Sequence, residues 1–481
     1  MNSFLKTLSI SIGILLIIGT SGYFAWFYNP YVHTLKLDPA NVYTSQNDGT
    51  LITNANIINI ETGEVQENHH LLVRSGIFDR IFEGSIPDSL SKLHTVVDAE
   101  NRYLLPGLID MHAHLNSGGL IPPEPSTRLI ALEQFAQYGV STIFTLGGHG
   151  FDQQITADLI SQQEDHELVG PQIFATGDIL TSPGGYPIPM VPMMTGIPAE
   201  EIVLSEQGII TVTDATELNA LFSRKKELGL NGVKVMVESG LAGSSEEPRI
   251  SNEQLRNITR TASEYDLPVF AHVSRQDDLW DAVNSGVDVI VHTVGDQLLT
   301  DAGAIFEKMK TDSVYYTPTL SIAYMYQYTA SAEILDDPFL QRFSSERTDR
   351  SLENWPIRQM MVKSSGIDPE TMNAVMLQNF KKFLEAGVPI LMGSDAGNPS
   401  VIPGYSAHNE LKFMAEQGMS NINILRSATI DPAKFLGIEA SHGSIEEGKT
   451  ASFLLLDDNP LEDITNSRSI NRVMLEGYWI E

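Results

Sequence analysis

Two histidines, His112 and His114, stand two residues apart at the end of an apolar run that begins at Leu105. Alternate side chains of a β-strand point to the same face, so both imidazoles can reach one metal ion. Neutral imidazole is the commonest protein ligand for zinc and similar metals. Such a pair also occurs on ordinary solvated strands. A metal site therefore requires further ligands at positions that a single fold brings together.

The fold that must position these ligands is indicated by apolar strands that alternate with helical stretches. This alternation is typical of βα units, and near-continuously apolar strands are typical of a parallel sheet covered on both faces. Eight such units predict an α/β protein with a closed (β/α)8 TIM barrel. An open doubly wound sheet is the alternative, but no glycine-rich phosphate loop follows the first strand. The predicted strands are Leu108–His114, Val140–Leu146, Gln172–Thr176, Val233–Val237, Val269–Val273, Val287–Thr293, Val314–Thr319 and Val388–Ser394.

Ligand-type residues occupy the carboxyl ends of several of these strands, where barrel enzymes place their catalytic groups. Beyond the histidine pair on the first strand, they are Lys234, His272, His292 and Asp395 on the fourth, fifth, sixth and eighth. Their positions are a second signal, independent of the first motif. The sequence therefore predicts a metal site at this end of the barrel.

Lys234 lies inside the apolar segment Gly232–Val237. Burial disfavours the charged ammonium and leaves a neutral amine, which can add carbon dioxide to form a carbamate. The two oxygens of a carbamate can bridge two metal ions about 3.5–4 Å apart. In the alternative, the lysine pairs with Glu238 or Asp395 beside a single metal ion.

The composition excludes several classes of protein. Asp and Glu number 61 against 30 Lys and Arg, which gives a formal net charge of −31. This charge repels phosphate backbones, so we expect no nucleic acid partner. The chain contains no cysteine, which excludes disulfides and thiolate metal sites. A metal must therefore be held by His, Asp, Glu or a modified Lys.

The chain of 481 residues suits one large domain with a smaller companion. Short strand patterns occur near both ends, and each set is too short to bury a core alone. We expect the two sets to complete each other as a small flanking β-sandwich. The predicted parts are a membrane anchor or signal (1–30), a linker (31–50), the composite sandwich (51–105 with 440–481) and the barrel (106–439).

The N-terminal segment carries the one targeting signal of the sequence. Leu8–Phe27 is a mostly apolar run of 20 residues preceded by Lys6, long enough to cross a membrane as a helix. We expect a transmembrane anchor with the body exported to the periplasmic or extracellular side. Small residues at Thr20–Gly22 interrupt the run. The alternative is therefore a signal peptide that is cleaved to release the body.

The motifs resemble those of the amidohydrolase superfamily over nearly the whole exported body. The pattern is most similar to the imidazolonepropionase-like branch, which also holds metal-dependent, prolidase-like dipeptidases. One departure is Ser452, where the family usually has Asp; it lies in the predicted sandwich, so we expect no effect on the chemistry. The matching segments are Pro106–His114, Phe270–His272, Val291–Thr293, Gly393–Gly397, Arg426–Thr429, Phe435–Gly437 and Gly443–Lys449.

The resemblance implies a ligand set and a reaction. It implies two zinc ions bridged by a carbamate on Lys234, and hydrolysis of an amide-type C–N bond by metal-activated hydroxide. Asp395 serves in this pattern both as a metal ligand and as the catalytic acid and base. The other implied ligands are His112 and His114 for the more buried metal, and His272 and His292 for the more exposed one.

The implied substrate is a small molecule such as a dipeptide or a cyclic amide. One alternative is a mononuclear, imidazolonepropionase-like hydrolase of cyclic amides. Another is a non-catalytic barrel that binds a metal or a solute, although such a protein has no need of all six ligand-type residues. We expect substrate contacts from His149, Tyr316 and His408. An oligomer is compatible with this class of enzyme.

Overall fold

The structure is a computed structural model, and the residues that it describes belong to one compact unit, Leu37–Glu481. The expected membrane segment (1–30) lies outside the described residues, as does the linker (31–50) except for its last two positions. Among the described residues, no helix is long and apolar enough to cross a membrane. The described residues are 49–116, 125–147, 153–165, 168, 170–190, 208–240, 247–331, 333–354, 358 and 369–480.

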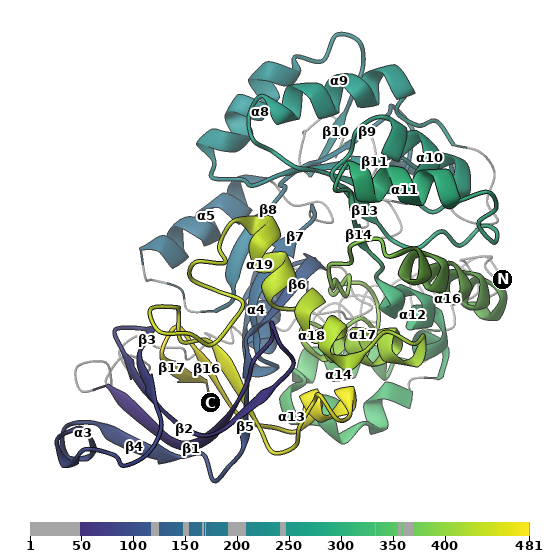
Figure 1. The fold of residues 1–481 in the computed structure, drawn as a ribbon. Helices are drawn as coiled ribbons and strands as arrows, with labels where there is room; N and C mark the ends of the chain where they lie inside the picture. Colours follow the sequence, from purple (N-terminus) through teal and green to yellow (C-terminus); the bar gives the residue numbers. More distant parts are fainter. Residues whose placement is uncertain are drawn as a thin grey trace, which may run out of the picture. The chain divides into compact units, whose positions relative to one another are not determined.

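Both ends of the described chain contribute to one eight-stranded sheet, whose strands are purple and yellow in Figure 1. Hydrogen bonding joins the two contributions into a single sheet through the antiparallel pair β5 and β15, in which Leu105 lies opposite Leu454. Phe78 and Phe453 are among the apolar side chains buried against it. The order is β17-β16-β15-β5-β1-β2-β3, with β4 paired to β1. The strands are β1 (Thr50–Ile58), β2 (Val65–Arg74), β3 (Ile77–Phe82), β4 (Thr95–Asp98), β5 (Tyr103–Pro106), β15 (Phe453–Leu456), β16 (Ile470–Leu475) and β17 (Tyr478–Ile480).

The central part of the chain forms two TIM-barrel-like parallel sheets, which confirms the predicted α/β class. The strands were predicted to form one closed sheet of eight, and two strands of the second sheet, β9 and β10, were not predicted. One sheet has the order β6-β7-β8, and the other has the order β10-β9-β11-β12-β13-β14. Asn231 links β8 to the start of β11, because its backbone N–H donates to the carbonyl of Ala175 at 2.7 Å. The strands are β6 (Leu108–Ala113), β7 (Val140–Thr145), β8 (Gln172–Ala175), β9 (Ile179–Thr181), β10 (Ile209–Thr211), β11 (Val233–Met236), β12 (Val269–His272), β13 (Val289–Val291) and β14 (Tyr315–Thr317).

The eighth predicted strand, Val388–Ser394, is not a regular strand. Isolated parallel bridges at Ile390 and Ala396 still join this segment to β14 and β6, so it connects the two sheets. Met392 donates its backbone N–H to the carbonyl of Ser427, which belongs to a helix. The ladder is therefore interrupted where the chain turns its polar residues toward the site.

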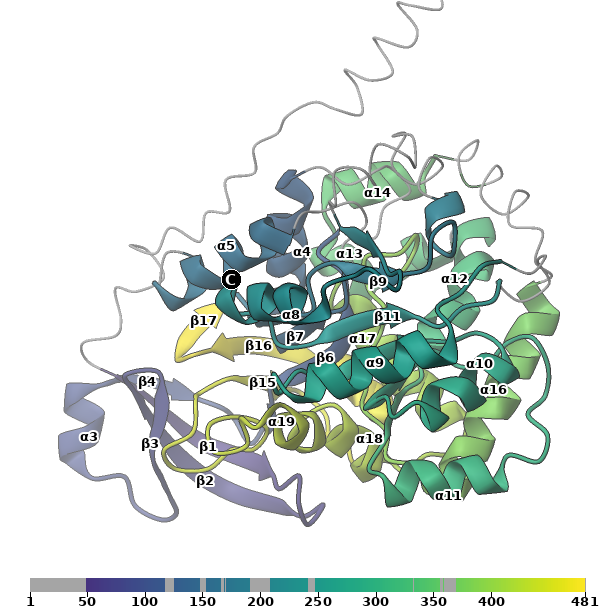
Figure 2. The ribbon, with the colours of Figure 1, turned by 90° about the horizontal axis from the view of Figure 1, so that it is seen from above.

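Helices pack against the parallel strands, and α8 and α9 lie beside β11 in both views (Figures 1 and 2). The start of helix α9 is determined by its local sequence, because Ser251 and Gln254 form a complete capping box there. The helices are α3 (Asp88–Leu93), α4 (Pro125–Gln137), α5 (Gln153–Glu164), η1 (Ile188–Met190), α8 (Leu218–Glu227), α9 (Asn252–Ser263), α10 (Gln276–Asn284), α11 (Gly303–Thr311), α12 (Leu320–Ser331), η2 (Glu333–Asp336), α13 (Pro338–Phe343), α14 (Glu346–Leu352), α16 (Pro369–Ala386), α17 (Tyr405–Glu416), α18 (Asn421–Ser427), α19 (Ile430–Leu436) and η3 (Ile464–Arg468).

Candidate metal centre

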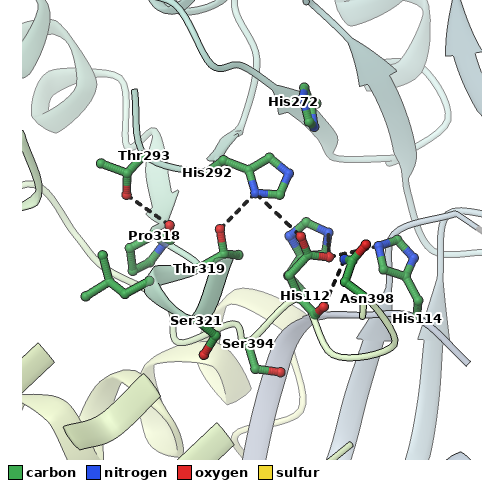
Figure 3. Close-up of polar contacts among 12 residues, drawn as sticks. His112, His114, His272, His292, Thr293, Pro318, Thr319, Ser321, Ser394 and Asn398 are labelled. Carbon is green, nitrogen blue, oxygen red and sulfur yellow. Dashed lines mark hydrogen bonds and ion pairs between the residues drawn. The ribbon is translucent and has the colours of Figure 1, made fainter. Parts of the chain in front are cut away.

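Polar side chains from the ends of several strands converge on one buried space (Figure 3). The ring of His292 lies 4.9 Å from that of His112 and 4.4 Å from that of His272, between ring centres. One ligand atom each from His112, His292 and Asp395 lies within 4.8 Å of the others. This spacing allows the three groups to hold one metal ion.

His112 and His114 face the same carboxylate. Their Nε2 atoms lie 3.2 Å and 2.9 Å, respectively, from Asp395 Oδ1. His114 Nδ1 lies 2.8 Å from the backbone carbonyl of Gly147, which can only accept a hydrogen bond. The proton of His114 is therefore assigned to Nδ1, and the lone pair of Nε2 faces Asp395. Proteins commonly orient metal-binding imidazoles by such a contact.

The backbone around His292 adopts an uncommon conformation. His292 and Thr319 have φ angles of 75° and 48°, in the left-handed region that residues with a Cβ rarely occupy. Thr319 Oγ1 lies 2.8 Å from His292 Nδ1, and the ring of Tyr186 stacks on His272 with 5.1 Å between ring centres. Sequence reasoning missed Thr319 and Tyr186, because only the folded chain brings them to the histidines.

Burial determines the protonation states in this space. It lowers the pKa of His112 and of His292 well below the ordinary value, which favours the neutral form that binds metals. Burial also opposes ionisation of Asp395, but positive charge on the facing imidazoles, that of His112 foremost, favours the carboxylate and holds the pKa of that carboxyl well below its usual range. Neutral imidazoles beside a carboxylate form a donor set suited to zinc.

Two fully enclosed lysines differ in their partners. Lys225 Nζ donates to the carbonyls of Thr176 and Asp178, at 2.5 Å and 3.2 Å. Lys234 Nζ has no hydrogen-bond partner within the described parts of the chain. Burial lowers the pKa of Lys234 to about 7, and the charge of Asp395 opposes this change. Much of this amine is therefore neutral near neutral pH, the form that can react with carbon dioxide.

The residues present fit a divalent metal. Buried polar atoms nearly always have a hydrogen-bond partner, and those that lack one require an explanation. At these strand ends, several atoms of potential metal ligands have no hydrogen-bond partner among the described residues. A bound cation would interact with the imidazole and carboxylate atoms of this set. The atoms are His112 Nδ1, Lys234 Nζ, both carboxylate oxygens of Glu238, His272 Nε2 and Asp395 Oδ1.

Asp110 positions the loop that follows the last barrel segment. Its carboxylate accepts hydrogen bonds from the N–H of Ser394 at 3.0 Å, the hydroxyl of Ser394 at 2.5 Å and the N–H of His112 at 3.1 Å. A Cβ on Gly393 would lie 2.8 Å from the Cβ of His112, so only glycine allows this approach. Sequence reasoning missed Asp110, although its spacing of two residues from His112 was an available signal.

Two of the expected substrate contacts require comment. His149 lies outside the described residues. Tyr316 is fully buried, with its ring stacked on Phe383 at 4.0 Å and its hydroxyl hydrogen-bonded to Thr293. The structure therefore places Tyr316 in the apolar core, where Phe383 covers its ring and Thr293 engages its hydroxyl. The expectation of substrate contact is corrected for this residue.

The third expected contact, His408, is also corrected. This side chain is buried in α17, with Nε2 at 2.8 Å from the carbonyl of Tyr138 and Nδ1 at 3.0 Å from Ser467 Oγ. Burial lowers the pKa of His408 to about 4. Both ring nitrogens are thus engaged by protein groups, and His408 joins α17 to the rest of the fold.

Parallel strands with a cluster of possible metal ligands at their ends are typical of metal-dependent barrel enzymes. Residues 103–480 match the model of the amidohydrolase family, and the chain belongs to this family. Members of the family generally use a divalent metal, and the group of His112, His292 and Asp395 can hold one. The chain is therefore a metal-dependent hydrolase that acts on carbon–nitrogen bonds of the amide type.

Two known proteins illustrate the similarity. The ochratoxinase of Aspergillus niger is 23% identical over 468 residues, which cover 91% of this chain and 87% of that enzyme. Its crystal structure superposes with a TM-score of 0.67 at 21% identity, over 90% of this chain and 96% of the other. A Xaa-Pro dipeptidase with bound methionine in its active site has a TM-score of 0.69 at 25% identity, over 90% of this chain and 100% of the other.

Proposed function

We propose that this protein is a binuclear zinc amidohydrolase that cleaves the amide bond of a small, dipeptide-like substrate. A carbamate on Lys234 would bridge the two metals. The observation that carries the proposal is the convergence, in one buried space, of neutral imidazoles, an ionised carboxylate and an amine that has no hydrogen-bond partner among the described residues. The similarity to proteins named as a dipeptidase and an ochratoxinase supports amide chemistry.

The side chains of the site have distinct roles in this reaction. When bound, the metals polarise the scissile carbonyl and make a water acidic enough to ionise near neutral pH. Asp395 is ionised, so a carboxylate oxygen is available to accept the proton of the attacking water. Asp395 then returns this proton to the nitrogen as the C–N bond breaks. The carbonyl carbon gains the oxygen, and the products are a carboxylic acid and an amine.

The proposed carbamate is the feature by which an experiment can distinguish a binuclear enzyme from a mononuclear hydrolase. Enzyme loaded with zinc and ¹³C-bicarbonate should show a carbamate signal by NMR and bind two metals per chain. Lys234→Ala should lose the signal and one metal. Lys225→Met, which alters the other enclosed lysine, should keep both. If Lys234→Ala and the wild type both bind one metal per chain and have similar activity, the binuclear proposal fails and the mononuclear one is favoured.

The substrate class requires a separate measurement. A panel of dipeptides, N-acyl amino acids and cyclic amides should reveal turnover by the metal-loaded enzyme, with dipeptide-like compounds preferred. Preference for cyclic amides would contradict the proposed class. Absence of turnover together with absence of bound metal, in folded protein, would favour the non-catalytic alternative.

We also propose that the body of the protein is exported and anchored by the N-terminal segment. The apolar run Leu8–Phe27 supports this proposal. Intact mass spectrometry of the membrane fraction should show the uncleaved chain. A mature start near Gly22 would favour a cleaved signal instead, and recovery of the whole chain from the cytoplasm would contradict export.

A further inference from the structure

Glu238 is a buried acidic residue that the expected ligand set does not contain. It lies two residues beyond the end of β11 and four beyond Lys234, so the alternation of a strand places both side chains on the same face. Met236 pairs with His272 across β11 and β12, which places Glu238 at the rim next to His272. Glu238 is 1 % exposed, and neither carboxylate oxygen has a hydrogen-bond partner among the described residues.

The contact between Glu238 and His272 has the geometry of two ligands of one metal. Glu238 Oε2 lies 3.3 Å from His272 Nε2, and neither atom has a hydrogen-bond partner in the described chain. The separation between His112 Nε2 and Asp395 Oδ1 is similar, at 3.2 Å. Tetrahedral zinc with bonds of about 2.1 Å places two ligand atoms about 3.4 Å apart.

Asp278 is a neighbouring carboxylate whose surroundings differ from those of Glu238. Asp278 accepts hydrogen bonds from the N–H and the hydroxyl of Ser239, at 2.9 Å and 2.8 Å, and forms an ion pair with Arg249. Its charge is thus compensated by the protein. Among the described residues, Glu238 has no hydrogen-bond donor and no Lys or Arg partner, and its contact is with His272 alone. A buried carboxylate without such partners is costly unless a cation is present.

We propose that Glu238 is an additional ligand of the metal held by His272 and His292. This inference rests on the proposed binuclear centre and extends it by one protein ligand. The carboxylate adds a negative charge and an oxygen donor to a position otherwise supplied by imidazoles and the carbamate. Oxygen donors suit harder ions such as Mn²⁺. The position near His272 should therefore accept Mn²⁺ more readily than it would without Glu238.

The inference is tested by titration of the metal-free protein with Co²⁺ in the presence of bicarbonate. We expect the wild type to bind two ions with distinct visible absorption. Glu238→Gln should bind the first ion normally, while its affinity for the second falls at least tenfold and the absorption of that ion changes. Glu238→Asp should have an intermediate affinity. Glu247→Gln is the matched control, because Glu247 is an acidic neighbour whose backbone N–H bonds to Ser239.

The outcomes separate this inference from the proposed function. Two ions with unchanged affinity and absorption in Glu238→Gln would overturn the inference and leave the binuclear centre intact. A single ion in the wild type would overturn the binuclear centre itself, and the inference with it. Unchanged metal binding with a raised KM only for substrates that carry a positive charge would assign Glu238 to substrate recognition instead, and would also overturn the inference. Normal binding of the first ion shows that the variant is folded.

Discussion

The carboxylate of Asp110 accepts two hydrogen bonds from Ser394, one from its backbone N–H at 3.0 Å and one from its hydroxyl at 2.5 Å. The two residues are 284 positions apart in the sequence. Each is adjacent to a metal-ligand segment, since Asp110 is in the strand of His112 and Ser394 precedes Asp395. These hydrogen bonds fix the position of the segment that carries Asp395 relative to the strand that carries His112.

Asp110→Ala should remove the hydrogen bonds that connect these two segments. Two buried backbone donors, the N–H groups of Ser394 and His112, would lose their acceptor, and each such loss costs about 1–3 kcal/mol. We expect a lower urea midpoint and a lower metal content. Ser394→Ala is the control, because it removes only the hydroxyl bond and should cost about 1 kcal/mol. Equal, small effects of the two substitutions would argue against a positioning role for Asp110.

Gly393→Ala should disrupt the metal centre sterically. The added Cβ would lie 2.4 Å from Thr317 Cγ2 and 2.8 Å from the Cβ of His112. Overpacking of this kind typically costs about 1–3 kcal/mol, and it would displace His112 from its metal position. Gly303→Ala provides a comparison, since an added Cβ there meets nothing within 4 Å. The thermal midpoint and the metal content should fall in Gly393→Ala and not in Gly303→Ala. Unchanged values for both quantities in Gly393→Ala would contradict the predicted steric conflict.

Glu410 should make stability depend on pH. Its carboxyl accepts hydrogen bonds from the N–H groups of Leu320 and Ser321 at the start of α12, at 2.6 Å and 2.8 Å. Burial raises the pKa of Glu410 to about 8. The folded protein therefore holds this proton more tightly than the unfolded chain does. As pH rises from about 4.5 to about 8, this group lowers the free energy of unfolding by up to about 1.4 kcal/mol per pH unit.

Glu410→Gln isolates this contribution. The amide does not titrate, so any stability advantage of the wild type over the variant should be largest near pH 5 and should shrink toward pH 8. Urea midpoints of both proteins at several pH values measure the difference. Two parallel curves over this range would mean that Glu410 does not retain its proton in the folded state.

Metal removal should lower stability and should be reversed only with bicarbonate. Without cations, the carboxylates of Asp395 and Glu238 remain buried beside imidazole nitrogens that have no partner among the described residues, and this destabilises the folded state. A chelator should therefore lower the thermal midpoint. Zinc with bicarbonate should restore it fully, and zinc alone only partly, because the carbamate on Lys234 needs carbon dioxide. Equal recovery in both conditions would contradict a carbamate bridge.

Much of the fold could be predicted because its signals are local. The predicted strands Val233–Val237 and Val269–Val273 match β11 and β12 to within one residue, because a strand that is buried on both faces has a continuously apolar sequence of its own. The last segment differs, because its backbone partners lie in a distant helix as well as in strands. The residue pattern within this segment does not indicate a hydrogen-bond partner that lies far away in the sequence.

The sequence by itself determined the order of βα units and the ligand-type residues at their ends, because these properties depend on residue type and short spacing. Only the tertiary structure decided which buried groups have partners. Lys225 and Lys234 are both buried, yet distant carbonyls accept hydrogen bonds from the first, and the second has no hydrogen-bond partner among the described residues. The same reason places His408 in the core and leaves Glu238 without a donor. Whether a buried polar group has a hydrogen-bond partner depends on contacts between segments far apart in the chain, and these contacts form only when the chain has folded.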